Sequence, residues 1–343
     1  AVNMRMGIKL LKIKKSSLRI PPVLVLFCLS PTIGELLSGS APPVEFFNPI
    51  GFLLLASLYG SGAILMRELT IRWRKGWFSL LLLGAAYGII EEGLMVKSFF
   101  DPNWPDLGFL GVFGRWMEVN WVWAEMLTIY HAVFSIAIPV LLVVLAYPSK
   151  RRAPWVGNRA LGGFIVLLAG VVLLGFFALT PYRPPIPQYF LTILMVILLL
   201  FLARKLPSDW GSLGSARPPK PAYFWAIGFL GSLGFFLLFW AVPYLLPLPS
   251  GVMLLGGFLV LGFLTFLKRF NWKEASDLHR FALASGGLSL FILLTPLQEL
   301  NTTRTDNPKG MTLVGLAFLI GLVLMGWRIR QRTRSSSFVP TAG

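Results

Sequence analysis

Two adjacent glutamates, Glu91 and Glu92, lie inside a long apolar stretch of this sequence. A charged residue at membrane depth costs roughly 2.5–3.5 kcal/mol to insert, so acids in such a stretch are candidates for function. On a helix both carboxylates flank a face formed by Gly84 and Gly88, and small-residue faces let helices pack closely. Because two adjacent carboxylates in a low dielectric do not both ionise easily, we expect the pair to hold at least one proton at pH 7 and to suit proton transfer.

A later apolar stretch supplies a further acid and an imidazole, Glu125 and His131. At 100° per residue, its polar side chains share one helical stripe: Glu125, Thr128, His131 and Ser135. The imidazole could share a proton with the carboxylates or bind a metal with them, and the sequence leaves both alternatives open. We therefore predict a catalytic site from four residues: Glu91, Glu92, His131 and Glu125. Glu35 lies at the same predicted depth. The competing interpretation is that these groups only stabilise helix packing through interhelical hydrogen bonds.

The composition places these residues in a membrane protein. Of the 343 residues, 56% are hydrophobic and 13% charged, and the mean hydropathy is +0.73. Soluble domains carry about 25% charged residues, so an ordinary soluble domain is excluded, and so is a disordered chain. The single cysteine, Cys28, excludes a disulfide within the chain and a cysteine-based zinc site.

The apolar stretches define the elements that must position the site. The sequence predicts an all-α, polytopic transmembrane helix bundle of about ten spans, since about 20 apolar residues cross a bilayer as a helix. The approximate ranges are 21–38, 50–67, 77–97, 121–146, 160–180, 187–203, 222–246, 250–267, 281–298 and 310–327. The basic start and first apolar run could form a signal peptide. However, Pro31 interrupts the run and Pro42 would follow the cleavage site, so we expect the span to be retained.

Basic residues alternate between the two ends of these spans. Most of the 31 Lys and Arg residues precede the first span, follow the last span, or lie in loops after even-numbered spans. The other side holds only Lys97, Arg115, Arg183, Arg304 and Lys309. By the positive-inside rule we predict a multi-pass protein of the plasma (cytoplasmic) membrane with both termini cytoplasmic. The net charge of +17 then reflects topology, and we expect no nucleic-acid partner.

The loops are short, and one of them divides the chain. We predict helices one to six with the candidate site in residues 1–206, a cytoplasmic linker at 207–221, and helices seven to ten with a basic tail at 222–343. The outer loop 101–120 combines glycines, prolines and spaced aromatics, which suit a re-entrant or interfacial segment over the bundle. Glu68 and Arg72, four residues apart at a helix end, predict a surface ion pair.

The segment GAAYGIIEEGLMVKSFF, residues 84–100, resembles the first motif of the CAAX protease and bacteriocin-processing (CPBP) membrane family. In that family an EExxxR helix is followed by a helix with FxxxH and later by one with HxxxN or HxxxD. The resemblance, which covers the third and fourth spans, implies an intramembrane hydrolase. In such an enzyme Glu91 would activate water, with Glu92 and His131 as its partners.

The sequence departs from this pattern at three places. Val96 stands at the arginine position, with the basic residue displaced to Lys97. Leu127 stands at the aromatic position of FxxxH, and the apolar spans hold no second histidine for the third motif.

Several functions are therefore open. The first is an intramembrane hydrolase with a buried Glu/Glu/His site in the outer half of the bilayer. A proton- or cation-coupled transporter would use the same acids as a relay. A lipid-linked glycosyltransferase would use outer acids such as Glu35 and Glu45, although such enzymes usually have larger outer loops. A structural membrane subunit needs no catalysis. We expect membrane lipids as partners and a peptide or lipid as the candidate substrate; the oligomeric state and the cofactor stay undetermined.

Overall fold

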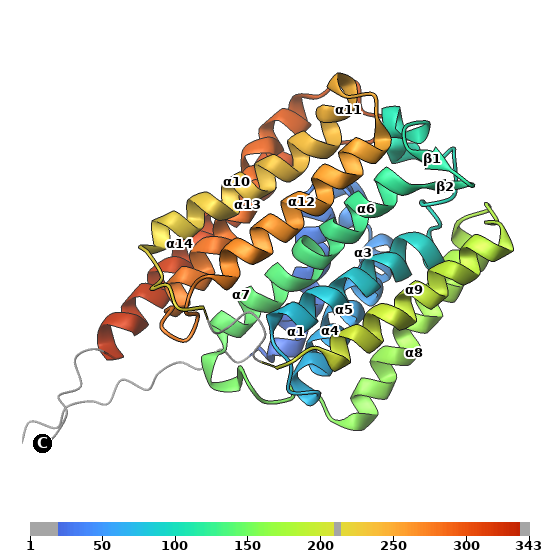
Figure 1. Cartoon of the computed structure of the whole chain (residues 1–343). Coiled ribbons are helices and arrows are strands. Elements are labelled where there is room, and N and C mark those ends of the chain that lie inside the picture. The colour runs from blue at the N-terminus through green and yellow to red at the C-terminus, as the bar shows by residue number, and fades with distance from the viewer. Residues whose placement is uncertain (1–19, 209–213, 337–343) are drawn as a thin grey trace, which may run out of the picture.

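The computed structural model describes residues 20–208 and 214–336, which form a bundle of apolar helices (Figure 1). Within these residues, nine helices are long and apolar enough to cross a membrane. They extend over Pro49–Arg72, Trp77–Met95, Trp121–Ala146, Asn158–Leu179, Ile186–Lys205, Pro221–Trp240, Pro249–Lys268, Asp277–Leu300 and Met311–Arg334. Each overlaps a span predicted from the sequence, so the all-α transmembrane fold class is confirmed.

The predicted first span is a shorter apolar helix. It consists of α1 (Pro22–Pro31) and the π-helical turn η1 (Thr32–Leu37). Sixteen residues at 1.5 Å each reach about 24 Å, whereas the hydrocarbon core is about 30 Å thick. Gly39, at a φ of 82°, lies just beyond this helix, and Pro42 N-caps the short α2 (Pro43–Phe46). About ten spans were predicted, and the described residues hold nine long helices and this shorter one.

Four of the long helices contain a π-helical segment. These helices are α3 (Pro49–Leu55)–η2 (Ala56–Gly60)–α4 (Ser61–Arg72), α5 (Trp77–Ile89)–η3 (Ile90–Met95), α6 (Trp121–Tyr130)–η5 (His131–Ala137)–α7 (Ile138–Ala146) and α8 (Asn158–Leu174)–η7 (Gly175–Leu179). The uninterrupted helices are α9 (Ile186–Lys205), α10 (Pro221–Trp240), α12 (Pro249–Lys268), α13 (Asp277–Leu300) and α14 (Met311–Ser336). Single-turn π segments are rare and occur frequently at functional sites, so their positions matter for the search for a site.

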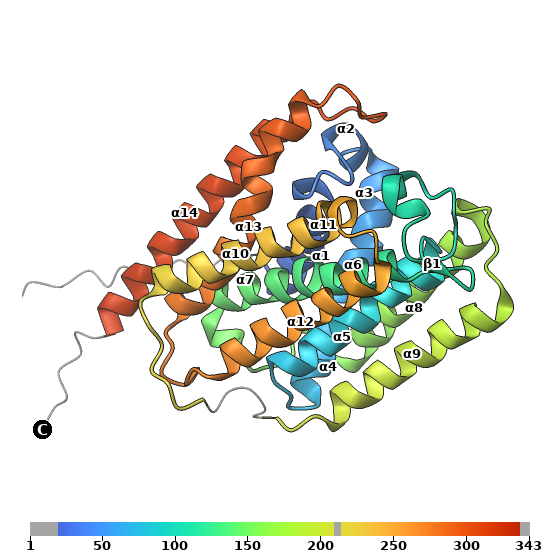
Figure 2. The ribbon, with the colours of Figure 1, turned by 45° about the horizontal axis from the view of Figure 1, so that its top comes forward.

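The helix α6–η5–α7 lies at the centre of the bundle. It contacts α5 and α1 on one side and α12 and α13 on the other. In both views α8 and α9 lie at one flank, and α10, α13 and α14 lie together at the opposite flank (Figures 1 and 2). Polar groups on the central helix are therefore shielded by protein on both sides.

The segment between α5 and α6 folds over one end of the bundle. It contains the 3₁₀ helix η4 (Pro105–Gly111) and a small hairpin of β1 (Arg115–Trp116) and β2 (Val119–Asn120). Leu107, Leu110 and Phe113 of this segment are buried against the bundle. Residues 101–120 thus cap the bundle end, and whether this cap sits in the membrane interface stays a prediction.

The opposite end carries η6 (Pro148–Lys150) and residues 214–220, which precede α10. The short α11 (Val242–Leu245) lies with the capped end (Figure 1). Backbone hydrogen bonds join Ala216 to the segment after α12, through Arg269 O and the Asn271 amide. Residues 209–213 of the predicted linker and the six basic residues before the first span lie outside the described residues. The division at 207–221 and the orientation of the termini therefore stay predictions.

Candidate functional site

Four π-helical segments bring polar side chains to one place inside the bundle. Glu35 belongs to η1, Tyr59 to η2, Glu91 and Glu92 to η3, and His131 to η5. Segment η1 contacts η5, while α5 packs closely along η5 and α1 along η2. A π-helical turn inserts an extra residue and rotates the side chains that follow it. The convergence of four such turns at the acidic residues points to a site rather than to four unrelated irregularities.

The glycines of α5 allow the central helix to approach the acids. A Cβ atom at Gly84 would lie 2.8 Å from Ala132 Cα, and one at Gly88 would lie 2.9 Å from His131 Cβ. Larger residues at these positions would therefore force the two helices apart. The small-residue face predicted from the sequence is confirmed, and it places His131 beside the acids that follow Gly88 on the same helix.

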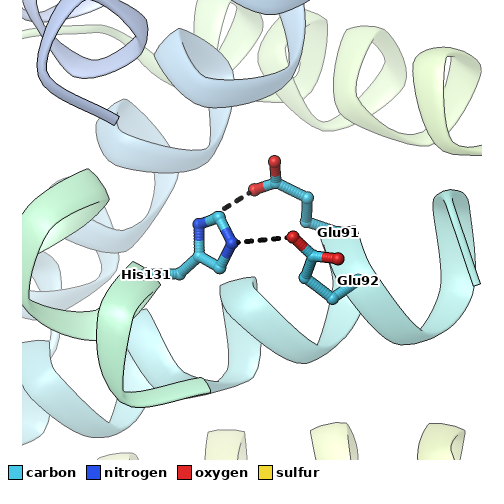
Figure 3. Close-up of side chains that lie close together, drawn as sticks. All are labelled: Glu91, Glu92 and His131. Atoms are coloured by element: carbon cyan, nitrogen blue, oxygen red, sulfur yellow. Dashed lines mark hydrogen bonds and ion pairs between the residues drawn. The ribbon is translucent and has the colours of Figure 1, made fainter. Parts of the chain in front are cut away.

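His131 bridges the two glutamates (Figure 3). Its Nε2 atom lies 3.0 Å from Glu92 Oε1, and its Nδ1 atom lies 3.3 Å from Glu91 Oε2. The side chains of His131, Glu91 and Glu92 are only 2%, 5% and 12% exposed. One donor atom from each of the three residues lies within 4.8 Å of the others, which is a spacing that could hold a metal ion.

A set of neighbouring side chains orients the cluster. Ser135, one turn beyond His131, places its Oγ atom 2.9 Å from His131 Nδ1. On the other side Trp123 Nε1 donates to Ser98 Oγ at 3.0 Å, and the Ser98 hydroxyl donates to Glu92 Oε2. The imidazole and one carboxylate are therefore each fixed by a partner outside the cluster, as residues in functional sites commonly are.

Aromatic rings enclose the imidazole. The ring centroids of Tyr130, Tyr59 and Tyr87 lie 5.2, 5.9 and 6.2 Å from that of His131. The Tyr87 side chain is fully buried, and its hydroxyl lacks a hydrogen-bond partner among the described residues although it lies near Glu91. Glu91 Oε2 is also buried, and it contacts His131 Nδ1 at 3.3 Å. Buried polar atoms without partners commonly indicate a bound water molecule or ligand.

Glu35 adds a third acid at the edge of this cluster. The Tyr59 hydroxyl donates to Glu35 Oε1, and Glu35 interacts electrostatically with His131 and Glu92. The expectation that Glu35 lies at the depth of the other acids agrees with this placement. Tyr87, four residues before Glu91 on the same helical face, was detectable from its spacing, whereas no spacing within the sequence connects Tyr59 with Glu35.

The structure does not bring Glu125 to the other three predicted site residues. Its carboxylate faces α12, where a Cβ atom at Gly256 would lie 2.6 Å from Glu125 Oε1. Its Oε2 atom is buried with no hydrogen-bond partner among the described residues. The regular helix α6 contains Glu125 and continues to Tyr130, and six steps of 100° place Glu125 about 120° from His131, so the two side chains face different neighbours. Glu125 is thus an isolated acid between α6 and α12.

Lys97 does not reach the acids either. Its Nζ atom donates to Phe176 O and Thr180 O, both at 2.9 Å, at the end of η7. Burial, together with the nearby charge of Arg183, lowers the pKa of Lys97 to about 8. The basic residue displaced from the arginine position of the CPBP motif therefore anchors α8–η7, and it forms no ion pair with Glu91 or Glu92 among the described contacts.

Charged loop residues lie above the cluster at the capped end. Asp106 of η4 is within electrostatic range of Glu92 and of Arg304. Arg304 donates to Gly39 O at 2.6 Å and pairs with Asp306, and this hydrogen bonding lowers the pKa of Asp306. The segment between α13 and α14 is thereby tied to the end of η1, close to the acids.

Comparison with known proteins supports the membrane assignment. A protein of Archaeoglobus fulgidus, described as an uncharacterized protein, is 29% identical over 125 residues. This match spans 36% of the present chain and 37% of the relative, so it covers about a third of each protein. No solved structure shows a significant match. The model of a family described as an uncharacterized membrane protein family matches residues 24–214, a range that contains all of the site residues described above. Because this range is more than half of the 343 residues, the chain belongs to that membrane protein family.

Proposed function

We propose that the protein is an intramembrane hydrolase in which Glu91, Glu92 and His131 activate a water molecule. The observation that carries this proposal is the buried His131 bridge between two carboxylates, with the Tyr87 hydroxyl lacking a hydrogen-bond partner beside it. A water molecule at that position could accept from the Tyr87 hydroxyl and donate to Glu91. The resemblance of residues 84–100 to the first CPBP motif agrees with this assignment.

The chemistry requires one proton acceptor and one proton donor. Glu91 would accept a proton from water as the water oxygen attacks the carbonyl carbon of a peptide or ester. His131 would deliver a proton to the departing nitrogen or oxygen as the carbon–heteroatom bond breaks. Ser135, next to Nδ1, and Glu92, next to Nε2, hold the imidazole ready for this transfer.

Substrate must come from the bilayer or from the capped end, because protein encloses the cluster. The side chains of Glu91 and His131 are almost completely buried, whereas Glu92 is slightly more exposed. We propose a membrane-embedded peptide or a lipid ester as the substrate, since either would reach this depth without leaving the membrane. Partial opening of the cap would admit it.

A second candidate function is proton- or cation-coupled transport. The observation that favours it is the series of acids that continues from Glu92 towards Asp106 in the capping segment. Buried acids in membrane proteins commonly serve as proton relays. Such a transporter would move an ion or solute across a vesicle membrane without releasing a hydrolysis product.

The two functions can be separated by isotope labelling. The protein in lipid nanodiscs is incubated in H₂¹⁸O with a mixture of synthetic membrane peptides and phospholipids, and carboxylate products are analysed by mass spectrometry. We expect ¹⁸O incorporation with the wild type and a loss of about 100-fold or more for Glu91→Gln, the scale of general-base catalysis. Replacing all three residues should cost little more than replacing one, because residues that act as a unit are not additive.

Glu125→Gln is the matched comparison, since it neutralises another buried acid in the same bundle. We expect it to retain ¹⁸O incorporation because Glu125 lies apart from the cluster. An equal loss in Glu125→Gln and Glu91→Gln would contradict the three-residue site. Absence of labelled product from the wild type, together with pH-dependent uptake into vesicles that Glu91→Gln abolishes, would favour transport.

A further inference from the structure

We propose that Glu91, Glu92 and His131 bind one divalent transition-metal ion. The inference rests on the proposed function of the same residues, and it names the chemical species that would assist them. The three residues come from two different helices, and one donor atom of each already lies within 4.8 Å of the other two. Ligand atoms bonded to one ion at about 2.0–2.2 Å lie roughly 3–4 Å apart. Small side-chain shifts would therefore complete the coordination.

The surroundings of His131 suit a metal ligand. Ser135 Oγ lies 2.9 Å from Nδ1 and can accept the Nδ1 proton. In that tautomer the lone pair of Nε2 faces Glu92 Oε1 at a distance of 3.0 Å. Two acceptors that face each other require a proton or a cation between them. A ligating histidine typically donates its other ring N–H to a polar partner, which is the role that Ser135 would have.

The surroundings of Glu92 show the same organisation. One carboxylate oxygen accepts the Ser98 hydroxyl, and Ser98 in turn accepts Trp123 Nε1–H at 3.0 Å. The other oxygen is left to face the imidazole. Hydrogen bonds to the outer oxygen of a ligating carboxylate hold the inner oxygen towards the metal.

Independent support comes from a polar group that the hydrogen-bond network leaves unused. The Tyr87 hydroxyl is fully buried, lies near Glu91 and lacks a hydrogen-bond partner in the described part of the chain. A water molecule on an ion bound by Glu91 could accept from this hydroxyl. An interhelical hydrogen-bond cluster that served only for packing would not leave it unpaired.

The donor set selects the kind of metal. Two carboxylates and a neutral imidazole balance the charge of a divalent cation, which suits a buried position. Mixed oxygen and nitrogen donors favour Zn²⁺, Mn²⁺ or Fe²⁺, whereas Mg²⁺ and Ca²⁺ prefer oxygen donors alone. A bound ion would lower the pKa of its coordinated water, the task that the proposed function gives to Glu91. With His131 as a neutral ligand, Glu91 would return the proton taken from that water to the leaving group.

Metal uptake can be measured without any substrate. The full-length protein is purified in detergent, treated with EDTA, and titrated with Zn²⁺, Mn²⁺ or Mg²⁺ in a calorimeter, with bound metal counted by mass spectrometry. We expect about one Zn²⁺ or Mn²⁺ per chain and much weaker Mg²⁺ binding. Removing one ligand in Glu92→Gln or His131→Ala should weaken binding by about 100-fold or more, whereas Glu125→Gln should bind as the wild type does. Ser135→Ala should weaken binding by about 10-fold or more through loss of the imidazole orientation.

The possible results separate this inference from the proposed function. No Zn²⁺ or Mn²⁺ uptake by the folded wild type would overturn the metal site, and so would uptake that Glu92→Gln leaves unchanged. Size-exclusion chromatography identifies variants that fail to fold. If His131→Ala fails to fold, the test uses Glu92→Gln, which is the more conservative change. If EDTA-treated protein that binds no metal still yields ¹⁸O-labelled product, the hydrolase stands without the ion. Metal uptake without hydrolysis would leave the ion site and reject the hydrolase.

Discussion

Two buried polar groups occupy opposite ends of the bundle, and they are built differently. Near the end that lacks the cap, Glu68 Oε1 accepts from Arg67 and from the Trp155 amide, and Glu68 Oε2 accepts from Arg72. The side chains of Arg67 and Glu68 are 1% and 0% exposed. Near the capped end, two carboxylates meet one imidazole, and a third acid, Glu35, lies nearby.

The first group is an anchor for a loop. Arg67 donates to Lys150 O, Arg151 O and Ala153 O, and its guanidinium lies 3.7 Å from the centroid of the Trp155 ring. Opposite charges are paired there and most donors are used, with only Arg67 Nε lacking a partner among the described groups of this network. The expected ion pair of Glu68 and Arg72 is present at 3.3 Å, but only Arg72 is partly exposed, at 24%, whereas Glu68 is buried because the loop 147–157 covers it.

The contrast distinguishes polar groups that stabilise from polar groups that react. The Arg67–Glu68 network satisfies its charges and fixes a loop, so its removal should damage the fold. The Glu91–Glu92–His131 cluster carries excess acid beside the unpartnered Tyr87 hydroxyl, features that contribute little to the fold and suit chemistry. Burial alone therefore does not identify a site; the balance of charge and the unused hydrogen-bonding atoms do.

The largest expected effect comes from making the same substitution in both groups. Glu68→Gln leaves the buried Arg67 without its counter-charge, and breaking a buried ion pair from one side costs about 3–5 kcal/mol. Glu92→Gln is measured with EDTA present. It puts a neutral isostere in a pair of glutamates that we expect to hold a proton, so it should lower the free energy of unfolding by less than about 1.5 kcal/mol. Thermal unfolding in detergent measures both.

Equal destabilisation by the two variants would contradict the distinction between a stabilising and a reactive polar group. It would indicate that Glu92 is ionised and paired for stability. Glu91→Gln and His131→Ala extend the test. Additive losses of stability across all three cluster residues would indicate that they only stabilise helix packing through interhelical hydrogen bonds. Small losses with intact folding would match a functional site.

A smaller effect tests whether close helix packing builds the cluster. A Cβ atom at Gly88 would lie 2.9 Å from His131 Cβ, so Gly88→Ala must displace the imidazole or the helix. Overpacking of this kind costs about 1–3 kcal/mol. A Cβ atom at Gly163 of α8 would meet no neighbouring atom within 4 Å, and Gly163→Ala should be neutral or stabilising by up to about 1 kcal/mol. Unfolding temperatures that fall equally for both variants would contradict the packing argument.

The sequence predicts the fold class, and three of its four candidate site residues lie together in the structure, for identifiable reasons. Apolar length alone locates the helices, and the Gly84/Gly88 face together with the buried charges locates Glu91, Glu92 and His131. Glu125 was misplaced because a stripe about 120° wide reaches two different neighbours: Glu125 faces α12, and His131 faces α5.

Contacts between segments far apart in the chain could not be predicted from the sequence. The Tyr59–Glu35 hydrogen bond joins residues 24 apart, and Arg67 reaches carbonyls more than 80 residues away. No local periodicity encodes such pairs, since they depend on how the helices pack. The burial of Glu68 was missed for the same reason, because the covering loop 147–157 is distant in sequence.

The smallest expected effect concerns Lys97, a buried cation near the acidic cluster that binds carbonyl groups instead of an acid. Its pKa is about 8 in the folded protein, compared with about 10.5 for an unperturbed lysine, because burial and Arg183 disfavour its charge. Between these values the unfolded chain holds more protons, so stability should rise with pH. Between pH 8 and pH 9 we expect a gain of about 1 kcal/mol, with little change from Lys97 below this window. The neutral amine still donates to Phe176 O and Thr180 O, which keeps α8–η7 in place at the higher pH.

Unfolding measured between pH 8 and pH 9 should show this rise in stability in the wild type but not in Lys97→Met. A rise of equal size in Lys97→Met would assign the pH dependence to another group, and falling stability in the wild type would show that the charged amine is favoured where it lies.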